Sequence, residues 1–184
     1  INEIVITKDL ILSKYDKIDK FFKDCLKTLY NEESNILRSN YVIDKIINIE
    51  ANNYLDKISD CSGYVGIYVF TDDKGFPQYI GKGGTSRKIN GRDIKFRIGQ
   101  ELCKYIGNNC NTLSKNIINI DTLLENKKIT PEESVEKIKK FNLIVLKIGE
   151  RLNKNNQINL GFIKKTEALE KLLLAIFPTK YNIA

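Results

Sequence analysis

Two short strings, Gly66-Ile67-Tyr68 and Tyr79-Ile80-Gly81, contain the residues of this chain whose types and spacing are best suited to chemistry. Histidine is absent from all 184 residues, which excludes Ser-His-Asp and Cys-His catalysis, His-metal clusters and a His general base. Any acid–base chemistry must therefore use Tyr, Lys, Glu, Asp or solvent. The two tyrosines are candidates if the fold holds both of them rigidly.

The segment that contains both strings predicts a β-hairpin. Residues 64–70 form a β-branched and aromatic run, residues 72–75 have turn chemistry, and residues 77–81 form a second short apolar run. Each strand can then hold one tyrosine. Gly81 lets the backbone leave the second strand in conformations closed to other residues, and it lets another molecule approach closely. The alternative interpretation is a pair of ordinary, half-covered strand tyrosines, because aromatic residues are favoured in strands.

The segment that follows the hairpin is strongly basic. Six basic side chains accompany a single acid, Asp93, and three of the five arginines in the chain lie here. Arginine offers a rigid fork of donors suited to phosphate. Directly after a glycine-rich strand end, this favours a polyphosphate partner, and a solvated basic helix face is the alternative in a lysine-rich chain. The six residues are Lys82, Arg87, Lys88, Arg92, Lys95 and Arg97.

The whole chain has the composition of a soluble globular protein, with 42% apolar and 29% charged residues. Residues 1–60 carry 9 basic and 11 acidic side chains, whereas residues 61–184 carry 21 basic and 12 acidic ones, so the basic excess accompanies the hairpin. No apolar run has the length of a membrane span and no signal peptide is present, so we expect a cytoplasmic protein. The four cysteines include no CxxC pair, which favours buried, reduced thiols over a zinc site.

Residues 1–60 predict a helical N-terminal extension. Apolar residues recur at helical spacing over residues 11–29 and again from about residue 35 to residue 58, and no proline interrupts either stretch. An antiparallel helix pair that packs on the rest of the chain or binds a partner is the simplest interpretation. We therefore expect a catalytic domain over residues 61–184, preceded by this extension.

The rest of the chain alternates helical and extended patterns. Thr130 and Glu133, with Pro131 between them, form a capping-box signature for the start of a helix. The expected order is β-β-α-(α)-β-α, an α/β sandwich with a small mixed or antiparallel three-stranded sheet flanked by helices. The expected elements after the hairpin are helices over residues 92–106, 117–126 and from 131, a strand over 141–148, and a helix over 166–177.

The last predicted helix supplies candidate carboxylates. Glu167 and Glu170 lie one helical turn apart, outside the leucine-rich face, and Pro178 ends the helix. The alternative interpretation is that both are solvated acids that interact with the helix dipole.

These features together resemble the GIY-YIG nucleases, and the resemblance covers residues 64–182. The family places a metal-binding Glu on its last helix, followed by an apolar pair, a Pro and an Asn; Glu170 fits this pattern better than Glu167, and Asn182 is the matching Asn. The family also places an Arg, followed by an apolar residue, on the helix after the second strand. Arg97, which precedes Ile98, fits better than Arg92.

The resemblance implies a role for each matching residue in hydrolysis of a phosphodiester. Glu170 would hold Mg²⁺ or Mn²⁺, and Arg97 would stabilise charge on the scissile phosphate. Tyr68 would be the general base, with its pKa lowered by nearby positive charge from Lys82 or the metal. Tyr79 would hydrogen-bond the phosphate or the water. Asn182 would brace the site.

The expected function is that of a metal-dependent endonuclease of double-stranded DNA, of a restriction type or from a phage or mobile element. Arg87, Lys88, Arg92, Lys95 and Lys82 would contact the DNA backbone, and a homodimer would make double-strand cuts. The alternatives are a branched-structure or repair nuclease, a non-catalytic nucleic-acid-binding module, and a protein-interaction domain whose helical arm does the binding.

Overall fold

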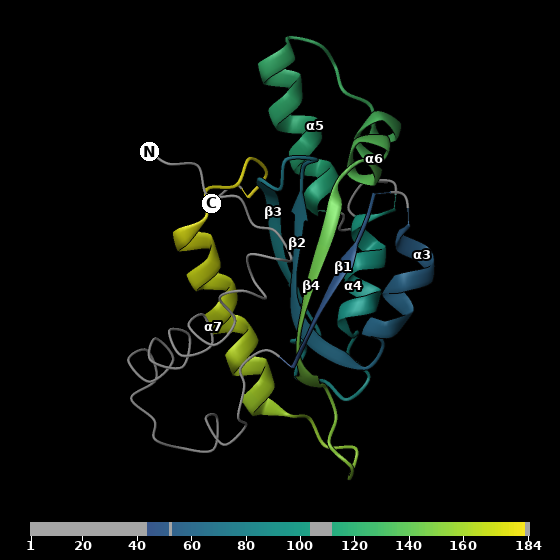
Figure 1. Ribbon diagram of the computed structural model, residues 1–184, viewed down its shortest axis with the longest axis vertical. Helices are drawn as coiled ribbons and strands as arrows, with labels where there is room; N and C mark the ends of the chain where they lie inside the picture. Colours follow the sequence, from purple (N-terminus) through teal and green to yellow (C-terminus); the bar gives the residue numbers. More distant parts are fainter. Residues whose placement is uncertain (1–43, 52, 104–111, 183–184) are drawn as a thin grey trace.

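A four-stranded antiparallel sheet forms the centre of the molecule (Figure 1). A computed structural model describes residues 44–51, 53–103 and 112–182 of the chain. The strand order is β1-β4-β2-β3, so β2 and β4 are the central strands. The α/β class is confirmed, but the sheet has four strands where three were expected. The strands are β1 (Lys45–Ile49), β2 (Tyr64–Thr71), β3 (Pro77–Gly83) and β4 (Asn142–Glu150).

The strand β1 corrects the predicted helix over residues 35–58. Its sequence, KIINI, pairs antiparallel with β4, with Ile46 opposite Leu146 and Ile47 opposite Val145. Three of its five residues are isoleucine, whose β-branched side chain favours strands, and pairing along β4 outweighs the local helical spacing. A short helix, α3 (Tyr54–Lys57), follows within the predicted range. The other predicted helix, over residues 11–29, lies outside the described residues.

The predicted hairpin is present as β2 and β3. Tyr68 lies opposite Gly81 in the register, and Phe70 lies opposite Tyr79. The turn is organised by Asp72, whose Oδ1 atom accepts hydrogen bonds from the backbone N–H groups of Lys74 and Phe76. The same strand β2 pairs with β4 on its other side, so Tyr68 is held between two neighbouring strands.

Helices cover both faces of the sheet (Figure 1). On one face α7 (Leu160–Ile176) packs against an aliphatic core that includes Val65, Ile67 and Ile80. The other face is aromatic, since it holds Tyr68, Phe70 and Tyr79. The short 3-10 helix η2 (Ile58–Cys61), which precedes β2 in the chain, packs on this second side. Three helices that come after β3 pack there too: α4 (Ile94–Glu101), α5 (Thr112–Glu125) and α6 (Pro131–Lys139).

The helix boundaries follow local chemistry. Asp93 caps α4, and Thr130 and Glu133 form the predicted capping box of α6. Two helices begin earlier than expected, α5 at Thr112 and α7 at Leu160, because their polar or glycine-containing first turns have loop-like composition. The last helix ends at residue 176, before Pro178 as predicted. Of the cysteines in the described part of the chain, Cys61 is buried and Cys103 is exposed.

Candidate active site

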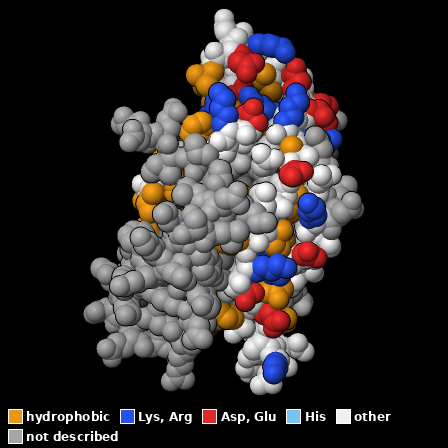
Figure 2. Space-filling view, viewed as in Figure 1, with side chains coloured by type: hydrophobic (Ala, Val, Ile, Leu, Met, Phe, Trp, Pro, Cys, Tyr) orange, Lys and Arg blue, Asp and Glu red, His pale blue; other side chains and the backbone are white. Residues whose placement is uncertain are grey.

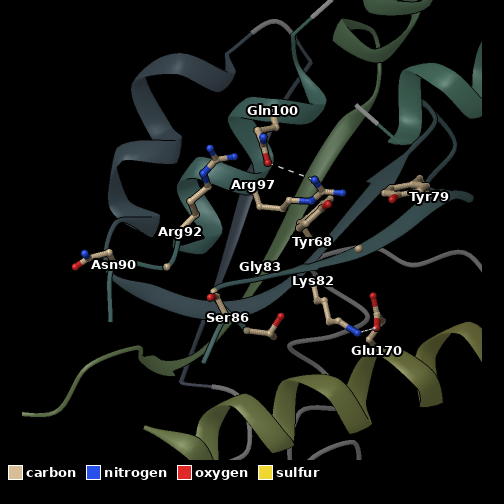
Figure 3. Close-up of a pocket in the computed structure, with 14 residues that line it drawn as sticks. Tyr68, Tyr79, Lys82, Gly83, Ser86, Asn90, Arg92, Arg97, Gln100 and Glu170 are labelled. Atoms are coloured by element: carbon tan, nitrogen blue, oxygen red, sulfur yellow. Dashed lines mark hydrogen bonds and ion pairs between the residues drawn. The ribbon is translucent and has the colours of Figure 1, made fainter. Parts of the chain in front are cut away.

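A cavity of about 510 Å³ opens between β3, α4 and α7 (Figure 3). Tyr68 and Tyr79 come from the two hairpin strands, Lys82 from the end of β3, Arg97 from α4 and Glu170 from α7. The structure thus brings together five of the six residues predicted to be catalytic. They lie up to 102 residues apart in the sequence, and the sixth, Asn182, is bonded to the backbone of β3 beside them.

Glycine at position 81 gives Tyr68 its place in the cavity wall. The Tyr68 ring packs over the backbone of Gly81, and a Cβ atom at this position would approach the Tyr68 hydroxyl to 2.5 Å. Any other residue at position 81 would therefore displace the tyrosine. Gly83 plays the same role toward α4, since a Cβ atom there would lie 2.6 Å from the Ile94 Cα atom. Both glycines thus permit a close approach of backbone and side chain.

A buried carboxylate, Glu101, contacts two of the predicted site residues. The Tyr68 hydroxyl donates a hydrogen bond to Glu101 Oε1 at 3.0 Å, and Arg97 Nη2 lies 3.0 Å from the same oxygen. The second oxygen, Oε2, accepts a hydrogen bond of 2.9 Å from the backbone N–H of Leu113. Glu101 has no exposed surface, and neither does Tyr68. We call Tyr68, Arg97 and Glu101 the site cluster.

Sequence reasoning missed Glu101. Its position four residues after Arg97 on a helix is the one available signal, because side chains with this spacing are neighbours. An acid on an amphipathic helix is usually solvated, so this spacing alone predicts an ordinary surface ion pair. The burial of Glu101 depends on the packing of α4 against β2 and α5, which the local pattern does not reveal.

The site cluster shifts the ionisation of its members. Burial, then the negative charge of Glu101, raises the pKa of Tyr68 well above its ordinary value of 10.0, and only Arg97 opposes this. The pKa of Tyr79 is raised in the same way, first by burial and then by the charge of Glu101. Burial also raises the pKa of Glu101 above 4.5, against the lowering effects of Arg97, the Leu113 N–H and the Tyr68 hydroxyl. Both phenols are therefore neutral near pH 7.

Lys82 and Glu170 form the other side of the cavity (Figure 3). Lys82 Nζ lies 2.5 Å from Glu170 Oε2, and the two side chains are 33% and 16% exposed. Glu170 lines the cavity, whereas its competitor Glu167 does not. No group of three metal-ligating side chains is present in the part of the chain that the structure describes. Mg²⁺ keeps several waters and is often held by one carboxylate and substrate phosphates, so Glu170, with Oε1 outside the ion pair, fits this mode of binding.

Asn182 is attached to the edge of β3. Its Oδ1 atom accepts a hydrogen bond from the Ile80 N–H, and its Nδ2 atom donates one to the Ile80 carbonyl, each at 2.7 Å. The Tyr181 N–H donates to the carbonyl of Gln78 at 2.9 Å. The amide of Asn182 thus continues the pairing of the sheet between Tyr79 and Gly81. The predicted role of Asn182 in bracing the site stays a prediction, and these hydrogen bonds are compatible with it.

Of the predicted DNA-contacting residues, Lys82 and Arg92 line the cavity and the others do not. Arg92 lines the cavity, and its guanidinium lies 4.1 Å from the centre of the Phe96 ring. Arg87 and Lys88 are exposed on the loop between β3 and α4, and Lys95 is partly exposed on α4 outside the cavity lining. The face in Figure 2 instead shows basic and acidic side chains interspersed over α5 and α6.

Arg151, which the sequence interpretation missed, holds the loop that carries Arg87 and Lys88. This buried side chain donates hydrogen bonds to the carbonyls of Ile89 at 2.8 Å and Ser86 at 3.0 Å, and to the carbonyl of Lys88. A single guanidinium therefore fixes the loop beside the cavity. No sequence signal distinguishes Arg151 from a surface arginine at the end of a strand.

Comparison with known proteins gives no relative for this chain. No protein-family model, no curated protein and no solved structure matches it. Among the described residues, no helix has both the length and the apolar character needed to span a membrane.

Proposed function

We propose that this protein is a divalent-metal-dependent endonuclease that hydrolyses phosphodiester bonds of DNA. One observation carries the proposal: the residues that the sequence indicated for phosphodiester chemistry come from four separate elements and line the same cavity. They include a carboxylate, two cations and two tyrosines, which are groups that can bind a metal, neutralise phosphoryl oxygens and handle protons. The resemblance to GIY-YIG nucleases is part of this proposal.

Each cavity residue has a separate role in the proposed hydrolysis. In this proposal Arg97, which is paired with Glu101, stabilises charge on the phosphoryl oxygens of the scissile phosphate, and Lys82 binds the same phosphate after it leaves Glu170. Tyr79, which lines the cavity, would orient the phosphate or the attacking water. Mg²⁺ or Mn²⁺ held by Glu170 would supply further charge neutralisation at the phosphoryl and leaving oxygens.

Double-stranded DNA is the proposed substrate. Arg87, Lys88, Arg92 and Lys95 lie on the loop and helix beside the cavity, where phosphate contacts would set the register of a duplex. A restriction-type enzyme, or an enzyme of a phage or mobile element, is the class we propose. The proposed site would cut one strand at a time, so a double-strand cut would use a homodimer.

A second candidate is a non-catalytic nucleic-acid-binding module with the same fold. The ion pair between Lys82 and Glu170 favours it, because a lysine ammonium then occupies the carboxylate that the metal needs. The two candidates make opposite predictions for a cleavage assay with and without a divalent metal.

The deciding experiment uses supercoiled plasmid and the variant Glu170→Gln. We expect the wild-type protein to nick or cut the plasmid in Mg²⁺ and to be inactive in EDTA. Glu170→Gln removes the charged ligand at nearly constant shape, so we expect its cleavage to fall at least ~100-fold. Its affinity for DNA in Ca²⁺, measured by fluorescence anisotropy, should stay within about threefold of wild type, since phosphate contacts provide the binding.

Glu167→Gln is the matched control, because Glu167 lies one turn away on α7 and outside the cavity lining. It should cleave at the wild-type rate. Equal loss in both variants would contradict the assignment of Glu170. Binding without any cleavage by the wild-type protein would favour the non-catalytic module.

A further inference from the structure

A buried Tyr68 presents a problem for general-base catalysis. The burial of Tyr68 and the nearby charge of Glu101 keep the phenol protonated, so it cannot take a proton from water unless it loses its own. The hydroxyl proton already points at an acceptor, because Tyr68 donates to Glu101 Oε1 at 3.0 Å. The structure therefore contains a second group for the proton to reach.

We infer that Glu101 is the terminal proton acceptor of the site and acts through the Tyr68 hydroxyl. This inference rests on the proposed function. Glu101 is a positioning residue in this arrangement, because the Tyr68 ring, and not Glu101, forms part of the cavity wall. The same carboxylate fixes Arg97, whose Nη2 atom lies 3.0 Å from Oε1.

The proton transfer balances in one concerted step. Water attacks phosphorus as its proton passes to Tyr68 Oη, while the Tyr68 proton passes to Glu101 Oε1; the bond from phosphorus to the leaving oxygen breaks. The leaving oxygen takes a proton from solvent. Before the next turnover Glu101 returns its proton to Tyr68 Oη as Tyr68 releases one to solvent. No tyrosinate accumulates, which avoids the cost of a buried phenolate.

The surroundings of Glu101 suit this role. Arg97 faces it from α4, the Leu113 N–H from α5, Tyr68 from β2, and the more distant Tyr79 from β3. Arg97 supplies positive charge here, but it does not outweigh burial, which raises the pKa of Glu101 and makes it a better proton acceptor than a solvated glutamate.

The first test needs neither DNA nor a metal. The ¹³Cζ resonance of Tyr68, assigned by its absence in Tyr68→Phe, reports ionisation of the phenol during a pH titration. Glu101→Gln should lower the pKa of Tyr68 by at least about one unit, because the negative charge and the carboxylate acceptor are removed. Conversely, Tyr68→Phe should raise the pKa of Glu101, read from its ¹³Cδ resonance, because a hydrogen bond to the carboxylate is lost. Unchanged values in both variants would overturn the coupling.

The second test is a double-mutant cycle on single-turnover cleavage in Mg²⁺. Glu101→Gln and Tyr68→Phe should each slow cleavage about 100-fold. The rate of the double variant should lie within about threefold of that of the slower single variant, because both substitutions interrupt the same proton path. Losses that multiply, or an active Glu101→Gln protein, would overturn the inference. Thermal unfolding and DNA affinity in Ca²⁺ verify that each variant is folded.

The two proposals fail in different ways. An inactive wild-type protein would overturn the proposed function and, with it, the role of Glu101 in hydrolysis. An active wild-type protein with an equally active Glu101→Gln variant would overturn the proton path alone. Tyr181→Phe is the matched control, since it removes another buried tyrosine hydroxyl that is bonded to a carboxylate outside the cavity.

Discussion

Two buried carboxylates of this protein are each bonded to a tyrosine hydroxyl and to cations, yet their surroundings differ. In the site cluster, Glu101 accepts a hydrogen bond from Tyr68 and forms an ion pair with Arg97. In the second, which we call the anchor cluster, Asp121 accepts a hydrogen bond from Tyr181 at 3.1 Å and is paired with both Lys137, at 2.6 Å, and Lys180, at 2.8 Å. Within the described residues, the number of cations paired with the carboxylate is the main difference between the two clusters.

That difference sends the two pKa values in opposite directions. Burial acts to raise the pKa of both carboxyl groups. The hydrogen bonds and charges of Lys137 and Lys180 outweigh burial at Asp121 and lower its pKa below 3.8, whereas Arg97 does not outweigh burial at Glu101. The lowered pKa of Asp121 suits a carboxylate that keeps its charge in a structural role, and the raised pKa of Glu101 suits one that accepts a proton.

The positions of the two clusters agree with this division. The anchor cluster joins α5, α6 and the C-terminal segment, and the residue after Tyr181 is Asn182, which pairs with β3. None of its members lines the cavity. We therefore expect its loss to affect stability, and the loss of the site cluster to affect chemistry.

The largest expected effect is on the cleavage rate, which substitutions in the site cluster should lower and substitutions in the anchor cluster should not. Tyr68→Phe and Arg97→Ala should each lower the single-turnover rate at least 100-fold, about 3 kcal/mol of transition-state stabilisation, because the first interrupts proton transfer and the second removes charge at the phosphate. Tyr181→Phe should leave the rate within about threefold of wild type. Quenched-flow or gel assays at saturating protein measure the rates.

Arg92→Ala is the control for Arg97→Ala, since Arg92 lines the same cavity but lies over the Phe96 ring, whereas Arg97 pairs with Glu101. It should chiefly weaken binding of DNA. A slow Tyr181→Phe variant with normal stability would remove the distinction between the clusters.

The sequence predicted the parts of this site that local patterns determine. The hairpin follows from β-branched runs around a turn, and the positions of Arg97 and Glu170 follow from helices with clear apolar faces. It did not predict Glu101, Arg151 or β1. All three depend on contacts between segments that are distant in the sequence, such as those of Arg151 with carbonyls of residues 86–89. The pairing of β1 with β4 likewise overrides the helical spacing of apolar residues in the β1 segment.

A smaller effect concerns stability. Asp121→Asn should lower the free energy of unfolding by about 2 kcal/mol, because Lys137 and Lys180 lose their counter-charge. The loss is no larger because both lysines are partly exposed and can be hydrated instead. Glu101→Gln should cost less, since the neutral side chain removes a charge that burial disfavours. Urea titrations at pH 7 give both values. A larger cost for Glu101→Gln than for Asp121→Asn would reverse the assignment of anchor and site.

The smallest effect is the pH dependence of these same stabilities, and its sign differs between the clusters. The lowered pKa of Asp121 means that its contribution is complete above its ordinary value of 3.8 and is lost as the pH falls through the lower value of the folded state. The stability gap between wild type and Asp121→Asn should therefore narrow on acidification below about pH 4.

For Glu101 the folded state binds its proton more tightly than the unfolded state does, so stability falls as the pH rises from 4.5 through the raised pKa. Glu101→Gln should thus gain stability relative to wild type over that rise. Parallel curves for the two variants would show that the two carboxylates ionise alike, and the comparison between the clusters would fail.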